Sequence, residues 1–194
     1  VNVGGERSFD FGQFESGKMT AKELNMVEDM ACPTCGSCSG MYTANTMNCL
    51  TEALGMGLPG NGTVPAVFSE RLRLAKKAGM QILEILKADL KPKDIMTKEA
   101  FVNAVAVDMA LGGSTNTALH LPAVAHDAGV KLTIDDFNEI AARVPQLCKL
   151  SPSGEYFIED LYRAGGVTAV MRRLLENGEL DGTQKTVALK TQEE

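Results

Sequence analysis

Apolar residues recur at helical spacing along most of this 194-residue chain, and glycine or proline ends nearly every such run. The clearest runs lie at 47–54, 64–90, 97–113 and 114–129. A capping Ser or Thr typically precedes a helix, and a glycine that can take positive φ typically follows it. Few segments alternate polar and apolar residues as half-buried strands do, and the best candidates are 129–134 and 185–191. The sequence therefore predicts a helix-rich α/β fold.

Several helix boundaries follow from local signals. Thr20 and Glu23 have the spacing of a capping box for a helix over 20–30. Thr97 caps the helix that Gly112 and Gly113 end, and the next helix begins at Ser114. Shorter helical patterns cover 133–144 and 158–178, the second broken by Gly165 and Gly166.

The longest predicted helix runs from Val64 to Leu90, with Thr63 as its cap and Pro65 in its first turn. Proline is tolerated there because the first-turn N–H groups have no partner inside the helix. Apolar residues at helical spacing form one stripe, which we expect to be buried. The stripe consists of Leu72, Ala75, Ile82, Leu83, Ile85 and Leu86.

Composition excludes several classes of protein. Hydrophobic residues make up 44% of the chain and charged residues 23%, as in ordinary soluble domains, so residues 1–194 are expected to form a single domain. The net charge of −6 and the lack of a basic run with interleaved aromatics argue against a nucleic-acid partner. No apolar run reaches the ~20 residues that cross a membrane. The five cysteines are an odd number and are bunched, which favours reduced thiols and a cytoplasmic location.

The segment CPTCGSC places Cys32, Cys35 and Cys38 at two successive C-x-x-C spacings. Thiolates at such spacings can converge on an iron–sulfur centre. Structural zinc is the competing metal, but it takes four ligands, and no fourth Cys or His lies close in sequence. Burial of the cysteines as small apolar residues is the third alternative. Cys38 is the best candidate for a ligand, since it lies at the start of a predicted helix, where the dipole favours a thiolate.

The segment GGSTN, residues 112–116, combines two glycines with the hydroxyls of Ser114 and Thr115. Backbone N–H groups at the start of a helix, together with these hydroxyls, could hold a carboxylate or phosphate. The alternative is an ordinary serine cap after a glycine stop.

Five segments, in order along most of the chain, resemble the dihydroxy-acid dehydratases of branched-chain amino-acid biosynthesis. They are ACPTCGSCSGMYTANTMNCLTEALG, LPGNGT, GGSTNTALHL, VPQLCKLSPSG and DLYRAGGV. The resemblance implies an internal fragment from the second half of an N-terminal α/β domain, without the C-terminal domain and inactive alone. The full-length enzyme would convert a 2,3-dihydroxy-3-methyl acid to a 2-oxo acid. A sugar-acid dehydratase of the same family and a small metal-binding interaction module are the alternatives.

The resemblance also implies cofactors. The family holds an iron–sulfur cluster, 2Fe-2S or 4Fe-4S, through three cysteines, beside a Mg²⁺ ion. Cys38 matches the last of these cysteines, whereas Cys32 and Cys35 are not assigned as ligands. The other two ligands and most magnesium ligands fall upstream of Val1, and a magnesium-binding glutamate and the proposed serine base fall in the C-terminal domain. This chain then holds no catalytic residue, and the full-length enzyme is expected to be a homodimer acting on a small dihydroxy acid.

Three segments are expected to meet in space if this resemblance holds. Ser114 or Thr115 should lie on the same face as Cys38, because both segments would present helix starts to an anionic ligand. The loop LPGNGT, residues 58–63, should lie over or beside the same region. Cys148 lies outside these segments and is expected only to pack.

Overall fold

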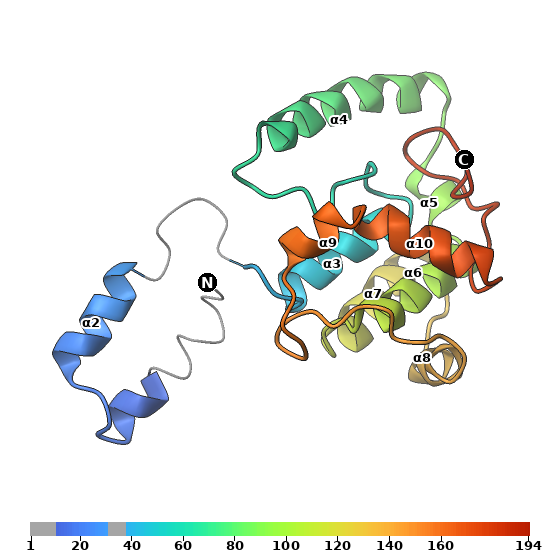
Figure 1. Cartoon of the computed structure of the whole chain (residues 1–194). Helices are drawn as coiled ribbons and strands as arrows, with labels where there is room; N and C mark the ends of the chain where they lie inside the picture. Colours follow the sequence, from blue (N-terminus) through green and yellow to red (C-terminus); the bar gives the residue numbers. More distant parts are fainter. Residues whose placement is uncertain (1–10, 31–37) are drawn as a thin grey trace.

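The structure is a computed structural model that describes residues 11–30 and 38–194. Figure 1 shows its helices joined by loops, with α6 near the middle of the body. The labelled helices are α2 (Ala21–Met30), α3 (Thr43–Ala53), α4 (Ser69–Lys87), α5 (Pro92–Ile95), α6 (Lys98–Leu111), α7 (Thr117–Ala128), α8 (Ile134–Ala141), α9 (Ile158–Arg163) and α10 (Gly166–Glu176). The prediction of a helix-rich chain is confirmed.

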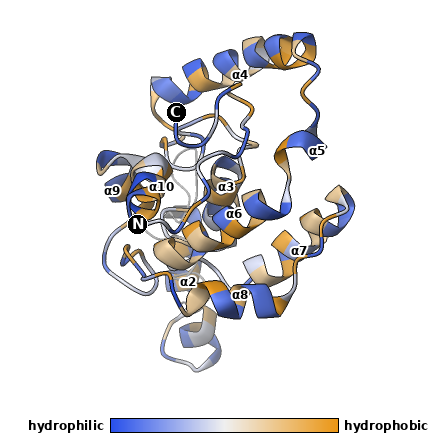
Figure 2. Ribbon diagram, turned by 90° about the vertical axis from the view of Figure 1, so that its right-hand side faces the viewer, coloured by the Kyte–Doolittle hydropathy of each residue, from blue (hydrophilic) through white to orange (hydrophobic). Residues whose placement is uncertain are grey.

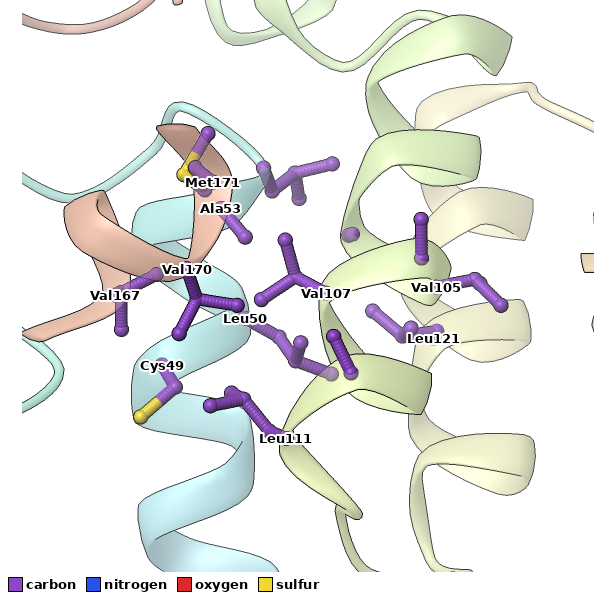
Figure 3. Close-up of a cluster of buried hydrophobic side chains, with 14 of the residues drawn as sticks. Cys49, Leu50, Ala53, Val105, Val107, Leu111, Leu121, Val167, Val170 and Met171 are labelled. Atoms are coloured by element: carbon purple, nitrogen blue, oxygen red, sulfur yellow. The ribbon is translucent and has the colours of Figure 1, made fainter. Parts of the chain in front are cut away.

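Helix α6 forms the centre of the core. It packs against α3, α7, α8 and α10. A helix that is apolar on every side is stable only when surrounded, and Phe101, Val105 and Leu111 of α6 are fully buried. Figure 3 shows Leu50 of α3 and Val170 of α10 among the side chains of this cluster. The burial of α6 therefore determines where its neighbours lie.

Local capping signals are borne out at several helix ends. Thr20 and Glu23 form the expected capping box, in which the Thr20 N–H donates to Glu23 Oε2 over 2.8 Å. The Thr97 hydroxyl accepts from the Ala100 N–H over 3.1 Å. Gly112 ends α6 at φ 67°, a left-handed conformation that favours glycine. The last predicted helix is divided at Gly165 into α9 and α10, also as expected.

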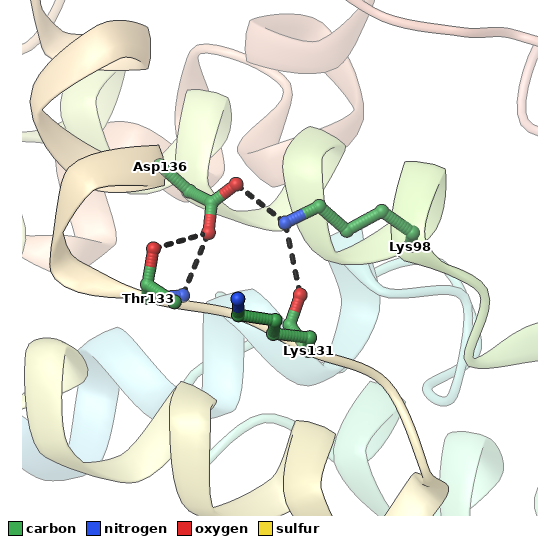
Figure 4. A network of polar contacts seen from close by, with 4 residues as sticks. All are labelled: Lys98, Lys131, Thr133 and Asp136. Carbon is green, nitrogen blue, oxygen red and sulfur yellow. Dashed lines mark hydrogen bonds and ion pairs between the residues drawn. The ribbon is translucent and has the colours of Figure 1, made fainter.

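A polar network joins the starts of α6 and α8 (Figure 4). The Asp136 carboxylate accepts from both the N–H and the hydroxyl of Thr133, over 2.7 and 2.8 Å, and forms an ion pair with Lys98. Lys98 also donates to the carbonyl of Lys131 over 3.0 Å. The Lys98 ammonium, together with the Thr133 donors, lowers the pKa of Asp136 to about 2. The network therefore favours the ionised carboxylate at the first turn of α8.

The predicted start of the longest helix is wrong. Helix α4 begins at Ser69 after the extended residue Phe68, and Thr63 is a buried residue of the preceding turn rather than a cap. Proline disfavours the helical conformation of the residue before it, so Pro65 keeps Val64 out of the helix. The Arg71 guanidinium closes the turn by donating to the carbonyls of Asn61 and Val64.

The expected burial of the α4 stripe is also wrong. No residue of α4 is buried, and Leu72 and Leu86 are 76% and 75% exposed. A cavity of about 390 Å³ lies between one side of the helix and the loop around Gly57. The pattern identified the apolar side of α4 correctly, but the described part of the chain does not cover it.

Neither predicted strand forms. Gly129 ends α7 at φ 80°, and Thr133 already caps α8, so the segment between them is a short connection. Residues 185–191 form a tight reversal with one antiparallel bridge between Lys185 and Thr191. Residues 11–30 and 38–194 contain only this bridge and a parallel one between Leu150 and Tyr156, and no strand of a sheet.

Helix α7 begins at Thr117, three residues later than expected. Ser114 lies in the turn that precedes it. Within the described residues, no helix is both long and apolar enough to cross a membrane.

Replacement of a core residue tests the central role of α6 and its neighbours. Leu50→Ala should lower the free energy of unfolding by about 2–5 kcal/mol, because it leaves a cavity against α6. Leu119→Ala, at a leucine that is 68% exposed on α7, should change it by less than about 0.5 kcal/mol. Urea denaturation measures both, and equal effects would contradict the assigned core.

Candidate functional site

Cys38 is the described cysteine of the C-x-x-C segment, because Cys32 and Cys35 lie outside the described residues. It is half-buried and precedes α3. The Asn45 side chain donates to the Cys38 sulfur over 3.5 Å and to its carbonyl over 3.1 Å. The same amide donates to the carbonyl of Gly40 over 2.8 Å, while the thiol itself contacts this carbonyl over 3.5 Å. Asn45 thus holds the cysteine beside the first turn of α3.

The GGSTN segment meets the same turn of α3. The Ser114 N–H donates to the Thr46 hydroxyl over 3.1 Å, and the hydroxyls of Ser114 and Thr43 lie 3.4 Å apart. The Asn116 side chain also donates to the Thr43 hydroxyl. Cys38 and Ser114 thus each contact the first turn of α3, Cys38 through Asn45 and Ser114 through Thr43 and Thr46.

Ser114 does not start a helix, contrary to expectation. Its N–H is used by Thr46, and its hydroxyl accepts from the Asn116 N–H over 3.4 Å. Thr115 is exposed, in the turn before α7. The segment consequently presents polar side chains beside α3, rather than the free first turn of a helix.

The LPGNGT loop lies against the other end of α3. The N–H groups of Gly60 and Gly62 donate to the Glu52 carboxylate over 3.1 and 2.8 Å, and the side chains of Asn48 and Asn61 are hydrogen-bonded over 2.8 Å. A buried carboxylate thus anchors this loop along α3, at residues other than Asn45, which contacts Cys38. Burial raises the pKa of Glu52, an effect that the two glycine N–H groups oppose.

Asp108 lies beneath the GGSTN segment and was missed by the sequence reasoning. It is 2% exposed on α6, and its Oδ2 accepts from the Thr117 hydroxyl over 2.7 Å. Its Oδ1 has no hydrogen-bond partner. Burial raises the pKa of Asp108 to about 6, despite the Thr117 hydrogen bond. A carboxyl group within the apolar run that precedes GGSTN was the available signal.

The other two described cysteines are Cys49 and Cys148. Burial raises the pKa of both Cys49 and Cys148, which keeps these thiols protonated. Cys49 packs in the core, where its thiol contacts the Gly62 carbonyl over 3.5 Å. Among residues 11–30 and 38–194, no three His, Cys, Asp or Glu side chains gather as metal ligands would. The described part of the chain therefore holds no complete metal site.

Sequence comparison places this fold and these segments in a known class of enzymes. Residues 6–194 match the family described as dihydroxy-acid/6-phosphogluconate dehydratase, N-terminal, and the chain belongs to that family. Two relatives named dihydroxy-acid dehydratase, from Moorella thermoacetica and Pyrococcus abyssi, are 63% and 61% identical to it over 180 residues. Each alignment covers 93% of this chain and 33% of the relative. The chain thus spans about a third of the length of these relatives, and the predicted family resemblance is confirmed.

Gly113 allows the close approach of the GGSTN segment to α6. A Cβ at this position would lie 1.9 Å from Asp108 Oδ1 and 2.7 Å from a methyl of Thr46. Gly113→Ala should therefore displace the segment and lower the free energy of unfolding by about 1–3 kcal/mol. Gly12→Ala is the control, since no atom lies within 4 Å of its added Cβ. Equal melting temperatures for the two variants would contradict the close packing.

Asp108 should make stability depend on pH in a defined direction. Its folded pKa, about 6, exceeds the ordinary aspartate pKa of about 3.8, so the folded state binds the proton more tightly. Its contribution to stability is full below pH 4 and declines by about 2–3 kcal/mol as pH rises through 6. Asp108→Asn removes this decline and still accepts from Thr117, so it should be the more stable protein above pH 6.

The matched control for this measurement is Asp127→Asn, at an exposed position of α7. Urea denaturation between pH 4 and 8 should give this variant the same pH profile as the unaltered protein. If the pH profile of Asp108→Asn also matches that of the unaltered protein, burial does not raise the pKa of Asp108.

Proposed function

We propose that this chain is part of a cytoplasmic dihydroxy-acid dehydratase, which removes water from a 2,3-dihydroxy-3-methyl acid to give a 2-oxo acid for valine and isoleucine biosynthesis. The observation that carries the proposal is the identity of about 60% to relatives that bear this name. Their common name favours dihydroxy acids over the sugar acids of related dehydratases. Residues 1–194 would be part of an N-terminal α/β domain, and the whole enzyme a homodimer.

Cys38 is the residue that we assign to the cofactor, as one of three cysteine ligands. Its sulfur is partly accessible, accepts a hydrogen bond from Asn45 and lies just before α3. A cysteine sulfur that is accessible and held in place can serve as a ligand of iron. Cys49 is fully buried, and Cys148 packs partly buried against the core.

When bound, an iron–sulfur cluster of the 2Fe-2S or 4Fe-4S type supplies Lewis-acid iron for the departing hydroxyl, beside Mg²⁺ at the substrate carboxylate. The chain's own contribution is to hold Cys38 in place through Asn45. The remaining cluster ligands, the magnesium ligands and the base belong to other parts of the longer enzyme. The 194-residue chain is consequently expected to be inactive alone.

Ser114 and Thr115 are assigned to the substrate region. The Ser114 hydroxyl is held by Thr43 and Asn116 at the first turn of α3, which Cys38 also contacts through Asn45, and Thr115 is exposed beside it. Hydroxyls fixed in this way can hydrogen-bond the oxygen atoms of a dihydroxy acid and so orient it. Asp108 supports the same segment from below through Thr117.

Replacement of Cys38 in the full-length enzyme tests the assignment. Cys38→Ser should lose both the cluster and turnover, because a hydroxyl coordinates iron poorly compared with a thiolate. Cys148→Ser is the matched control and should keep its iron, sulfide and most of its turnover. Iron and acid-labile sulfide analysis decides the result, and a Cys38→Ser enzyme that keeps its cluster and activity would contradict the assignment.

A further inference from the structure

Residues 147–158 contain most of the VPQLCKLSPSG motif and lie outside the segments assigned to the cofactor and the substrate. The first residues of this 147–158 segment are fixed to the core, because the N–H groups of Leu147 and Cys148 both donate to the carbonyl of Ala110, over 2.8 and 3.0 Å. Ala110 is fully buried near the end of α6, the helix that lies beside α3 inside the body (Figure 2). The segment therefore starts from the centre of the core.

A tight turn gives the 147–158 segment a defined shape. The Gly154 N–H donates to the carbonyl of Leu150 over 3.1 Å. The Ser151 N–H donates to the carbonyl of Tyr156 over 2.7 Å, which joins the two arms of the turn. A Cβ at Gly154 would lie 2.1 Å from the carbonyl oxygen of Lys149, so the turn leaves no room for a side chain at this position.

The same segment binds the chain just after Cys38. The Met41 N–H donates to the carbonyl of Ser151 over 2.6 Å. The Ile158 N–H donates to the carbonyl of Ser39 over 2.8 Å. The loop that carries the candidate ligand is therefore held at two points by one segment, which is itself hydrogen-bonded to α6.

Gly40 lies where the segment and the candidate ligand meet. Its carbonyl contacts the Cys38 thiol over 3.5 Å and accepts from the Asn45 side chain over 2.8 Å. A Cβ at Gly40 would lie 2.7 Å from the carbonyl oxygen of Ser151 and 2.8 Å from Cε2 of the Tyr42 ring. Such distances are too short for a packed interior without displacement of one of the groups. The missing side chain of Gly40 thus allows Ser151 to approach the residue that contacts the Cys38 thiol.

Asn45 alone does not account for the position of Cys38. Its Nδ2 lies 3.5 Å from the Cys38 sulfur, 3.1 Å from the Cys38 carbonyl and 2.8 Å from the Gly40 carbonyl. An amide group has two N–H bonds to donate, which is fewer than these three acceptors. The backbone hydrogen bonds at Ser39 and Met41 share no donor with one another, so they fix the loop independently of this side chain.

We propose that the 147–158 segment positions Cys38 as a ligand before any cluster binds, with Gly40 as the positioning residue at which the segment meets the cysteine loop. The inference rests on the proposed function, because it takes Cys38 as a ligand of the cluster. A ligand that is already held in place loses little conformational freedom when it binds a metal. The hydrogen bonds to Ala110 thereby connect the position of the ligand to the buried helix α6.

Alkylation of the full-length enzyme in its cluster-free form tests the positioning without the cofactor. Gly40→Ala should push the loop away from Ser151, and Cys38 should then react with iodoacetamide about fivefold faster or more, because its neighbours no longer shield the sulfur. Mass spectrometry of the labelled peptides measures the rate at each cysteine. Cys49 is fully buried and should react slowly, so that it reports on the folded state of the core.

Gly79→Ala on α4 is the matched control, since no atom lies within 4 Å of its added Cβ. Its Cys38 should react at the rate of the unaltered protein. A Gly40→Ala enzyme whose Cys38 reacts no faster than this control, while Cys49 stays protected, overturns the proposal.

Gly154→Ala tests the positioning from a residue at the far end of the turn. Its added Cβ meets the carbonyl of Lys149 and distorts the turn, so Cys38 should again react about fivefold faster while Cys49 stays protected. This variant decides the result if Gly40→Ala does not fold. Unchanged reactivity of Cys38 contradicts the proposal. Loss of Cys49 protection in both variants also does so, because the segment would then support the whole core rather than Cys38.

Cluster retention separates this inference from the proposed function. In the cluster-loaded enzyme, both glycine variants should release iron to a chelator about fivefold faster than Gly79→Ala and change the visible circular dichroism of the cluster. If Cys38→Ser loses its cluster while the two glycine variants match the control in both measurements, only the positioning role is overturned. If Cys38→Ser keeps its cluster, the ligand assignment and the positioning role both fail.

Discussion

The burial of α6 on all sides is the constraint on which the rest of the structure depends. Its apolar residues, Val105 and Leu111 among them, are satisfied only when α3, α7, α8 and α10 surround the helix. The left-handed turn at Gly112 then directs the chain back toward α3. Ser114 meets Thr46 at that point, so the geometry of the candidate site is a consequence of core packing.

Two buried carboxyl groups, Glu52 and Asp108, connect the core to polar segments. Burial of an acid costs free energy unless hydrogen bonds offset it. Glu52 accepts two backbone N–H groups and so anchors a loop, whereas Asp108 has one hydroxyl partner and an unpaired oxygen. The less satisfied group lies under the segment assigned to the substrate. A buried polar group that lacks hydrogen bonds lowers stability, and proteins retain such groups mainly at functional sites.

Local features were predictable from sequence, and contacts between distant segments mostly were not. The caps at Thr20 and Thr97 depend on neighbouring residues, so short spacings identify them. The alternation of polar and apolar residues in 129–134 wrongly predicted a strand. Gly129 ends α7 and Thr133 caps α8, so too few residues remain between them for a strand. That Ser114 and Cys38 both contact the first turn of α3 could be expected only through the family resemblance. The contact of Asp108 with Thr117 and Gly113 depends on how α6 packs against the following segment, which the spacing of residues in the sequence does not reveal.

Helix α4 shows what an amphipathic pattern determines. Periodicity indicates which side of a helix is apolar, but it carries no information about the element that covers that side. Leu72 and Leu86 are 76% and 75% exposed, so local spacing identified the apolar side of α4 but not its burial. Burial depends on contacts between segments that are distant in the sequence, as the position of Asp108 under the GGSTN segment does.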